Sequence, residues 1–297
     1  MDIRQLRYFL RVAELRSFTR AAEDLRIAQP ALSRQVKLLE EEFGLSLLHR
    51  HGRGVELTDA GATLLARSTG LIGEFDRLTQ DMHAHAGGKE LQGSMTLGVP
   101  ISISRKVTMP ILARCRAALP GVAVRVVEGH SEMIADWLTG GRVELAILFG
   151  DHPRRLIAAE FLAREEIVVV AAANSPWAGR ASITPAELVS VPLVLPRRPH
   201  ATWTMLDAAG IVPGRVIEAD TLLEMLQHVH QGDGVTLLTA GAVEQERAGG
   251  SVRIVPIASP GLFRAVVLGR ATTHPLPAIA EAVGALIRVE FAAIGAG

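Results

Sequence analysis

Residues 17–50 read SFTRAAEDLRIAQPALSRQVKLLEEEFGLSLLHR, and this stretch decides the fold of the N-terminal part of the chain. Ser17 is a good helix cap, and the apolar spacing behind it predicts a short helix over residues 19–25. A tight turn follows. Pro30 suits the first turn of the next helix because its missing N–H costs nothing there, and Gly44 ends that helix. The stretch therefore predicts a helix-turn-helix.

The second of these helices, about residues 30–43, has two different faces at about 100° per residue. Its apolar stripe consists of Leu32, Val36, Leu39 and Phe43. Its polar face consists of Gln29, Ser33 and Lys37, with Pro30 and Arg34 beside them. This face carries no acid, and amide, hydroxyl and cationic groups read base edges in the major groove of DNA. An ordinary surface helix is the alternative, since polar faces are common.

Two further elements flank the helix pair. Apolar residues at helical spacing predict a first amphipathic helix that contains Ile3, Leu6, Leu10 and Ala13. Residues 47–57 predict a small hairpin with a Gly-Arg-Gly tip, which would be a wing. Arg50 at its base and Arg53 at its tip are placed to meet phosphates or the minor groove, unless they are ordinary solvated loop arginines.

Together these residues resemble the LysR-type transcriptional regulator family. The resemblance is ordered and nearly ungapped, and it is carried by Leu6-Arg7-Tyr8-Phe9, Ser17-Phe18-Thr19-Arg20-Ala21-Ala22, Gln29-Pro30-Ala31-Leu32-Ser33-Arg34-Gln35, Leu38-Leu39-Glu40, Phe43-Gly44, Arg50 and Leu57-Thr58-Asp59-Ala60-Gly61. Two positions depart from the family pattern. Ala28 stands where members often have Ser or Thr, which weakens the cap of the second helix, and Leu48 stands where they usually have Phe.

A long connecting helix is predicted from Asp59 to about residue 86, roughly 42 Å at 1.5 Å per residue, with Thr58 as its cap. One stripe repeats every 3.5 residues and consists of Leu64, Ser68, Leu71, Phe75, Leu78 and Met82. Such a stripe predicts pairing with the same helix of a second chain, although it could also pack on its own chain. The resemblance implies that this helix forms dimers and that members commonly assemble as tetramers. His83 and His85 do not share a helix face, so they predict no metal site.

The remainder of the chain alternates strand and helix patterns. The predicted strands are residues 95–99, 122–127, 144–149, 167–171, 193–195, 215–218, 235–238 and 265–268. The predicted helices are residues 107–118, 132–138 and 276–291, with others centred on Met205, Met225 and Val243. This alternation predicts a parallel α/β sheet. Two lobes that the chain crosses near residues 161–164 and 263–265 resemble the periplasmic-binding-protein fold, which the family resemblance also implies.

Ligands in such sheets bind at the carboxyl ends of the strands, where helix N-termini offer free N–H groups to an anion. The candidate effector-binding residues in these positions are Ile101, Ser102, Ser131, Pro196, Arg197, His200 and Thr239. The resemblance implies effector contacts for Ser102 and Ser131. A capping or turn role is the alternative for each of them. A small anionic effector is therefore predicted, but its identity is not.

The whole architecture predicted is an N-terminal all-α winged helix-turn-helix over residues 1–58, a dimerisation helix over 59–88 and a two-lobed α/β effector domain over 91–297. Lobe 1 takes about 91–162 and 266–297, and lobe 2 about 163–265. The expected partners are promoter DNA of the T-N11-A type, a small-molecule effector, RNA polymerase and further copies of the chain as a homodimer or homotetramer, with no membrane and no cofactor. The resemblance supplies these expectations.

Composition sets limits on other functions. Lysine plus arginine and aspartate plus glutamate both number 31, so charge alone makes no case for DNA. The single Cys115 excludes an intramolecular disulfide, and no signal peptide or apolar span is evident, which predicts a cytoplasmic protein. The Gly129-His130-Ser131-Glu132-Met133 run lacks the final Gly of a hydrolase nucleophile elbow. A transporter's solute-binding protein and a helix-turn-helix used for protein contact are the remaining alternatives.

Overall fold

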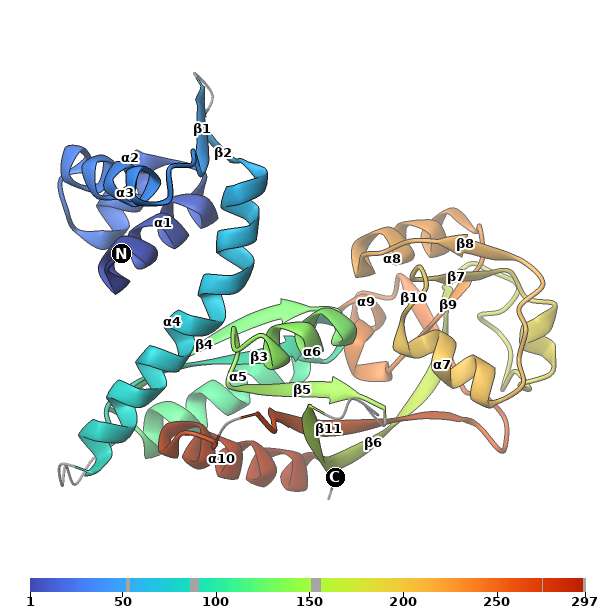
Figure 1. The fold of residues 1–297 in the computed structure, drawn as a ribbon. Coiled ribbons are helices and arrows are strands. Elements are labelled where there is room, and N and C mark those ends of the chain that lie inside the picture. The colour runs from blue at the N-terminus through green and yellow to red at the C-terminus, as the bar shows by residue number, and fades with distance from the viewer. Residues whose placement is uncertain (52–53, 86–90, 151–155, 274, 296–297) are drawn as a thin grey trace. The chain divides into compact units, whose positions relative to one another are not determined.

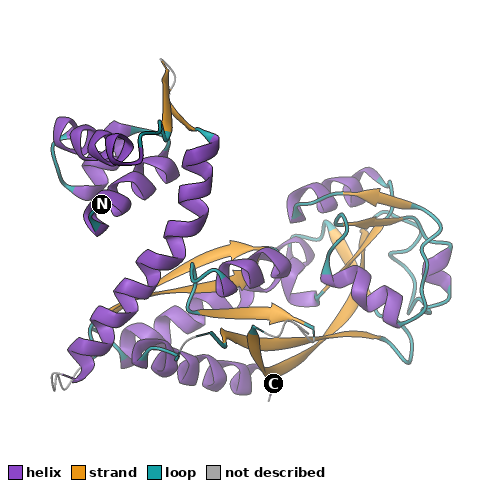
Figure 2. Cartoon of the chain, viewed as in Figure 1, coloured by secondary structure: helices purple, strands orange, loops and turns teal. Residues whose placement is uncertain are grey.

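The computed structural model describes residues 1–51, 54–85, 91–150, 156–273 and 275–295 (Figures 1 and 2). The chain divides into two compact units, one of Met1–Gly87 and one of Gly88–Thr139 with Val143–Gly297. Each unit has its own buried apolar core. We describe them separately.

The first unit is the predicted winged helix-turn-helix with a long helix after it. Its elements are α1 (Ile3–Leu15), α2 (Phe18–Leu25), α3 (Gln29–Phe43), β1 (Leu48–His51), β2 (Gly54–Leu57) and α4 (Asp59–His85). Ser17 caps α2 as predicted, since its hydroxyl accepts from the Arg20 backbone N–H. Ala28 gives α3 no side-chain cap, and Gly44 ends α3 with φ of +65°. The strands β1 and β2 pair antiparallel, as the hairpin prediction requires.

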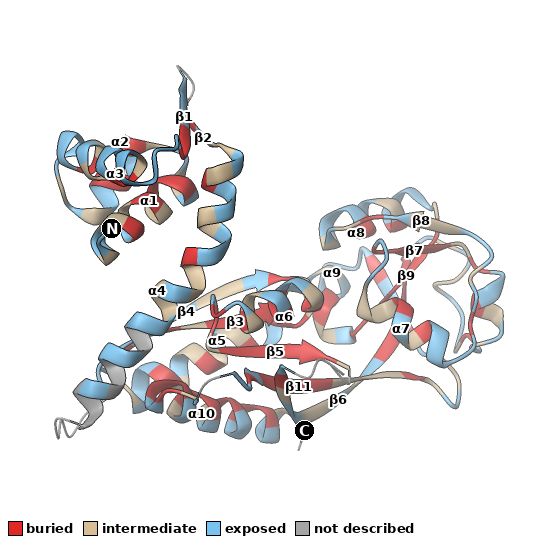
Figure 3. Ribbon diagram, in the orientation of Figure 1, coloured by how far each residue is buried: buried red, intermediate tan, exposed pale blue. Residues whose placement is uncertain are grey.

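The core of the first unit lies between α1, α2, α3 and the hairpin (Figure 3). The stripe of α3 contributes Leu32, Val36 and Leu39, each 0% exposed. The prediction that Phe43 belongs to this stripe is wrong, because Phe43 is 41% exposed. Phe43 is the last residue of α3. It lies beyond the last buried position of the stripe, so the helical spacing overestimates the buried length of the helix by one turn.

The second unit contains one sheet of nine strands within its described residues. They are β3 (Gly93–Pro100), β4 (Val122–Gly129), β5 (Leu145–Phe149), β6 (Ile157–Ala172), β7 (Leu193–Leu195), β8 (Val216–Glu218), β9 (Val235–Leu238), β10 (Val252–Val255) and β11 (Leu262–Ala271). Their order is β4-β3-β5-β11-β6-β9-β7-β8, and β10 also pairs with β6. The expectation of a parallel sheet holds for β3, β4 and β5 and for β7, β8 and β9. It is wrong for β6 and β11, which run antiparallel to their neighbours.

The two antiparallel strands join the two halves of this sheet. From Leu262 to Ala271, β11 pairs with β6, with one bulge, while Val168–Val170 of β6 pair with β9. We call the half that contains β3, β4 and β5 lobe 1, and the half that contains β7, β8, β9 and β10 lobe 2. The chain therefore crosses between lobes along β6 and back along β11, in the region that the sequence predicts.

Helices cover both faces of the sheet in each lobe. They are α5 (Ile101–Ala118), α6 (Ser131–Thr139), α7 (Ala201–Ala208), α8 (Leu222–Gln231), α9 (Glu244–Ala248) and α10 (Ala278–Gly295), with 3₁₀ turns at Glu187–Val189 and Ala240–Val243. In lobe 1, α5 and α10 pack on one face and α6 on the other. In lobe 2, α7 packs on one face and α8 on the other. Cys115 is buried within α5, as expected for a small apolar residue.

Helix α5 begins six residues earlier than the sequence predicts. It starts at Ile101 and not at Val107, because Ile103 is buried at the same helical spacing as Val107 and Ile111. The residues expected as a loop after the first strand therefore form the first turn of a helix. No helix among the described residues is both long and apolar enough to span a bilayer.

The contrast between Phe9 and Phe43 gives a stability prediction. Phe9 is 0% exposed in the first unit, so Phe9→Ala should lower the free energy of unfolding by about 3–5 kcal/mol. Phe43→Ala should lower it by less than about 1 kcal/mol, because Phe43 is 41% exposed and lies outside the buried core of this unit. Urea titrations of both full-length variants, followed by helical circular dichroism, measure the difference. Equal losses of unfolding free energy in the two variants would contradict the burial of Phe9 in this core.

Candidate functional site

The polar face of α3 lies on the surface of the first unit. Gln29, Pro30, Arg34 and Lys37 are exposed, and Ser33 is half-buried. The spacing along α3 brings all five predicted residues to one side of the helix, opposite the buried stripe. Lys37 has a single acidic neighbour on its own helix, Glu41, at 3.5 Å. The face is therefore free, within this unit, to meet a ligand.

Arg50 links the hairpin to α3. Its Nη1 donates to the Ser33 hydroxyl at 2.9 Å, and its guanidinium carbon lies 4.2 Å above the Phe18 ring. The side chain is thus held between the N-terminus of α2 and the polar face of α3, so the wing cation and the α3 hydroxyl form one surface. Arg53, the other predicted wing residue, lies outside the described residues.

The apolar stripe of α4 is uncovered along its second half. Leu71, Phe75, Leu78 and Met82 are between 44% and 64% exposed in the single chain. Phe75 also contacts its own chain, because the guanidinium carbon of Arg7 lies 5.9 Å from its ring centroid. Leu64, at the start of the stripe, does pack against the core of the first unit.

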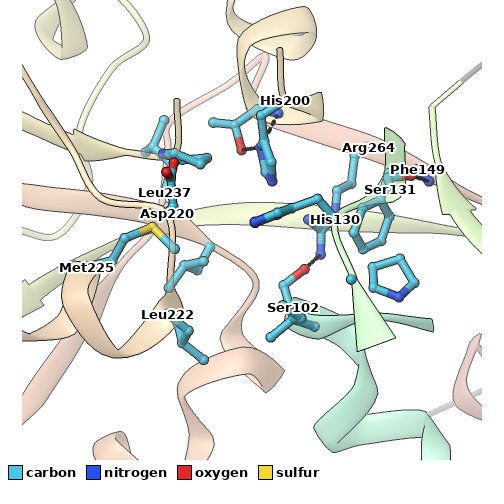
Figure 4. A pocket seen from close by; sticks show the side chains of 16 residues that line it. Ser102, His130, Ser131, Phe149, His200, Asp220, Leu222, Met225, Leu237 and Arg264 are labelled. Atoms are coloured by element: carbon cyan, nitrogen blue, oxygen red, sulfur yellow. Dashed lines mark hydrogen bonds between the residues drawn. The ribbon is translucent and has the colours of Figure 1, made fainter. Parts of the chain in front are cut away.

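A pocket opens between the two lobes of the second unit, with about 560 Å³ of empty space, part of it open to solvent. Figure 4 shows the side chains that line it. Lobe 1 contributes Pro100, Ile101, Ser102, Gly129, His130, Ser131 and Phe149, lobe 2 contributes Pro196, His200, Thr202, Asp220, Leu222, Met225, Leu237 and Leu238, and Arg264 comes from β11. Five of the seven predicted effector residues therefore line one pocket.

The other two predicted residues lie elsewhere. Arg197 lines a neighbouring hollow, and its guanidinium pairs with Asp220 at 2.5 Å while its backbone N–H donates to the same carboxylate at 3.1 Å. This contact lowers the pKa of the Asp220 carboxyl below its ordinary value. Thr239 is buried and precedes the 3₁₀ turn at Ala240–Val243. Arg197 therefore contacts Asp220, which lines the pocket, and Thr239 is not among the residues that line it.

The first turns of four helices border the pocket. Ile101 and Ser102 begin α5, Ser131 begins α6, His200 caps α7, and Leu222 begins α8. Helix N-termini carry unpaired N–H groups and a partial positive charge, which favour anions. The Ser131 hydroxyl already accepts from the Phe149 backbone N–H at 2.9 Å, so part of its capacity is used within lobe 1.

Arg264 is one of the pocket residues that the sequence prediction missed. It lies on β11, where its guanidinium pairs with Glu165 of β6 at 2.8 Å. Burial lowers the pKa of Arg264 and the Glu165 carboxylate raises it, and a guanidinium stays protonated at any physiological pH. The available signal was an arginine inside the predicted second crossing, with acidic residues directly after the first.

His200 of lobe 2 and His130 of lobe 1 face each other across the pocket, with ring centroids 5.4 Å apart and planes nearly perpendicular (Figure 4). The Thr202 backbone N–H donates to His200 Nδ1 at 3.2 Å, so the cap needs an unprotonated Nδ1. The pKa of His200 is lowered to about 4, first by burial and then by the nearby charges of His130 and Arg264, while Asp220 opposes the shift. At neutral pH His200 is therefore an uncharged ring with an Nε2–H donor.

A metal ion has no ready site here, since no three His, Cys, Asp or Glu side chains of the described residues are grouped to hold one. The pocket is thus defined by positive helix ends, one buried guanidinium, uncharged imidazole and an apolar wall. The fold, the exposed polar face of α3 and the pocket between the lobes define a DNA-binding regulator with a ligand-binding domain.

Comparison with known proteins gives the same result. The family model for "Bacterial regulatory helix-turn-helix protein, lysR family" matches residues 3–62, and that for "LysR substrate binding domain" matches residues 88–292. The chain is 30% identical over 249 residues to the probable cat1 operon transcriptional activator of Acinetobacter lwoffii, covering 82% of each protein. It is 28% identical over 288 residues to the nitrogen assimilation regulatory protein nac of Klebsiella aerogenes, covering 95% of this chain and 93% of that protein.

Among solved structures, a full-length OxyR variant from Pseudomonas aeruginosa superposes with a TM-score of 0.71 at 25% identity, covering 97% of this chain and 95% of that one. This chain belongs to the LysR family of bacterial transcription regulators. Members of this family combine helix-turn-helix DNA binding with an effector-binding domain, oligomerise and are not enzymes.

The depressed pKa of His200 predicts how stability changes with pH. Between about pH 6.5 and 4 the unfolded chain binds a proton at this histidine and the folded chain does not, so stability falls as pH falls. The difference of about 2.5 pKa units corresponds to about 3 kcal/mol at pH 4. We expect NMR titration of the full-length protein to show His200 neutral at pH 6.

His200→Asn is the matched control, because Asn also caps helices but does not titrate. In this variant the free energy of unfolding should fall much less between pH 6.5 and 4 than it does in the wild type. Urea unfolding of both proteins at each pH measures the difference. A wild-type His200 that titrates near pH 6.5 would contradict the pocket environment described here.

Proposed function

We propose that residues 1–58 bind operator DNA of the T-N11-A type through the exposed face of α3, with the hairpin against the backbone. The observation that carries this proposal is that α3 has one fully buried face and one exposed face whose N-terminal turns carry no acid, with Glu41 near its C-terminal end. Gln29, Ser33 and Arg34 are the candidates for base contacts. Pro30 lies beside them in the first turn, and Lys37, Arg50 and Arg53 are the candidates for phosphates and the minor groove.

Residues 59–88 are proposed to pair two chains along the exposed stripe of α4. Four large apolar side chains at 3.5-residue spacing are the pattern of a two-helix seam. A dimer places two α3 helices on a two-fold DNA site, and two dimers make the expected homotetramer. Because bacterial DNA lies in the cytoplasm, a cytoplasmic location is part of this proposal.

Residues 91–297 are proposed to bind a small anionic effector in the pocket between the lobes. The four helix ends and Arg264 favour negative charge, and Ile101, Phe149, Leu222, Met225 and Leu237 offer an apolar wall. Among the predicted residues, Ser102 and His200 Nε2–H are the candidate donors, and Ser131 and Pro196 shape the pocket.

Effector binding shifts the arrangement of the lobes and so the bend of the DNA that RNA polymerase meets. This requires that the effector bind one arrangement better than the other.

Removal of the α3 donors tests the DNA assignment. Ser33→Ala and Arg34→Ala should each weaken binding to a duplex with a T-N11-A palindrome by about 1–3 kcal/mol per lost base contact. Arg125→Ala is the control, because Arg125 is an exposed arginine on β4 of the second unit. Gel-shift titrations at fixed salt measure the three variants beside the wild type.

Wild-type protein that binds no promoter duplex at low salt would contradict the regulator assignment. It would favour the helix-turn-helix as a protein-contact module or the second unit as a simple solute binder. Equal weakening by all three arginine and serine variants would place the DNA surface elsewhere.

A charge within the α4 stripe tests the proposed dimer. Leu71→Glu should destabilise the dimer by about 3 kcal/mol or more, because two leucine side chains each lose roughly 1.5–3 kcal/mol of burial. Ala66→Glu is the control, since Ala66 is exposed on the opposite side of the same helix. Sedimentation equilibrium of the full-length chain measures both. An unchanged dimer in Leu71→Glu would exclude this stripe as the seam.

A further inference from the structure

One buried ion pair ties together the two strands that cross between the lobes. Arg264 of β11 stands directly opposite Glu165 of β6 in the antiparallel register. Its Nε and Nη2 both donate to Glu165 Oε2, at 2.9 and 2.8 Å. The two side chains are only 9% and 11% exposed. Charges this deeply buried interact strongly, because little water screens them.

The same guanidinium forms part of the pocket. Its Nη2 also donates to the Ser102 hydroxyl at 3.3 Å, and its carbon lies 3.5 Å from the centroid of the Phe149 ring. Figure 4 shows the Ser102 hydroxyl directed at the Arg264 side chain. Arg264 therefore touches both crossing strands, the first turn of α5 and the end of β5. A ligand at the Ser102 end of the pocket lies beside the crossing strands.

The contacts of Arg264 leave part of its guanidinium able to bind an anion. Among the described residues they use Nε and Nη2, and the Nη1 amino group takes part in none of them. An anion that binds at Ser102 and the guanidinium would be close to the Glu165 carboxylate. Two negative groups on one cation repel each other. A charge within about 4–6 Å of an ionisable group shifts the pKa of that group by about one to three units, so interactions of this size can change a binding constant tenfold or more.

We propose that Arg264 is the group that senses the effector's anionic end, and that the anion weakens the Arg264–Glu165 pair which holds β6 to β11. The inference rests on the proposed anionic effector. The anion then binds best to the arrangement in which Glu165 has moved away from Arg264, which is the differential affinity that a switch needs. Because β6 and β11 are the two crossings between the lobes, a change in their pairing changes the angle between the lobes.

Removal of the competing carboxylate tests the proposal. Butyrate, a carboxylate with an apolar body, and its uncharged amide butyramide are titrated into the full-length protein and followed by NMR. Glu165→Gln should bind butyrate about tenfold more tightly than the wild type, with no gain for butyramide. Glu160→Gln is the matched control, because Glu160 lies on the same strand in an exposed pair with Arg288. It should bind both probes like the wild type.

A second readout separates sensing from simple structural support. Butyrate should speed amide hydrogen exchange at residues 163–167 and 262–266 in the wild type but not in Glu165→Gln. The double variant Arg264→Gln with Glu165→Gln avoids a lone buried charge and should lose the preference for butyrate over butyramide.

The outcomes distinguish this inference from the function on which it rests. Wild-type protein that binds butyrate no better than butyramide would contradict the proposed anionic effector. A clear wild-type preference for butyrate that is unchanged in Glu165→Gln and in the double variant would overturn the role of Arg264 and leave the anionic effector standing.

Discussion

The burial of one stripe of α3 is the constraint on which the DNA-binding surface depends. Leu32, Val36 and Leu39 are locked into the core of the first unit, so the opposite face of the helix must remain on the surface. Arg50 adds to this constraint by joining the hairpin to Ser33 and by covering Phe18. The surface is thus fixed before DNA arrives, which reduces the ordering needed on binding.

The second unit has a different task, since in the proposed function it holds a ligand and changes shape. Its two lobes have separate cores, and β6 and β11 are the strands that pair from one into the other. The pocket therefore forms where a small ligand can touch both lobes and the crossing strands together. Helix ends supply fixed positive potential there, and the Arg264–Glu165 pair supplies a charge balance that a ligand can alter.

Sequence patterns predicted the elements with a periodic or a continuous apolar pattern. The apolar stripe of α3 is periodic, and β7 and β9 are short runs that are buried at every residue. The outer halves of β6 and β11 were missed because residues such as Glu165 and Arg264 interrupt the apolar run. Their pairing is between segments about 100 residues apart, which no local pattern records. Arg197 was predicted as a pocket residue because it follows a strand, but its carboxylate partner Asp220 is also a distant residue.

The central claim is that the exposed face of α3 touches DNA bases, and site-specific photocrosslinking tests it directly. A benzophenone side chain replaces Arg34 in one full-length variant and the exposed Arg125 in another, and each is irradiated with a labelled duplex that the wild type binds. The account predicts a crosslink to bases of the half-site from position 34 and none from position 125. Binding of the duplex with no crosslink from position 34, or with equal crosslinks from both positions, would contradict it.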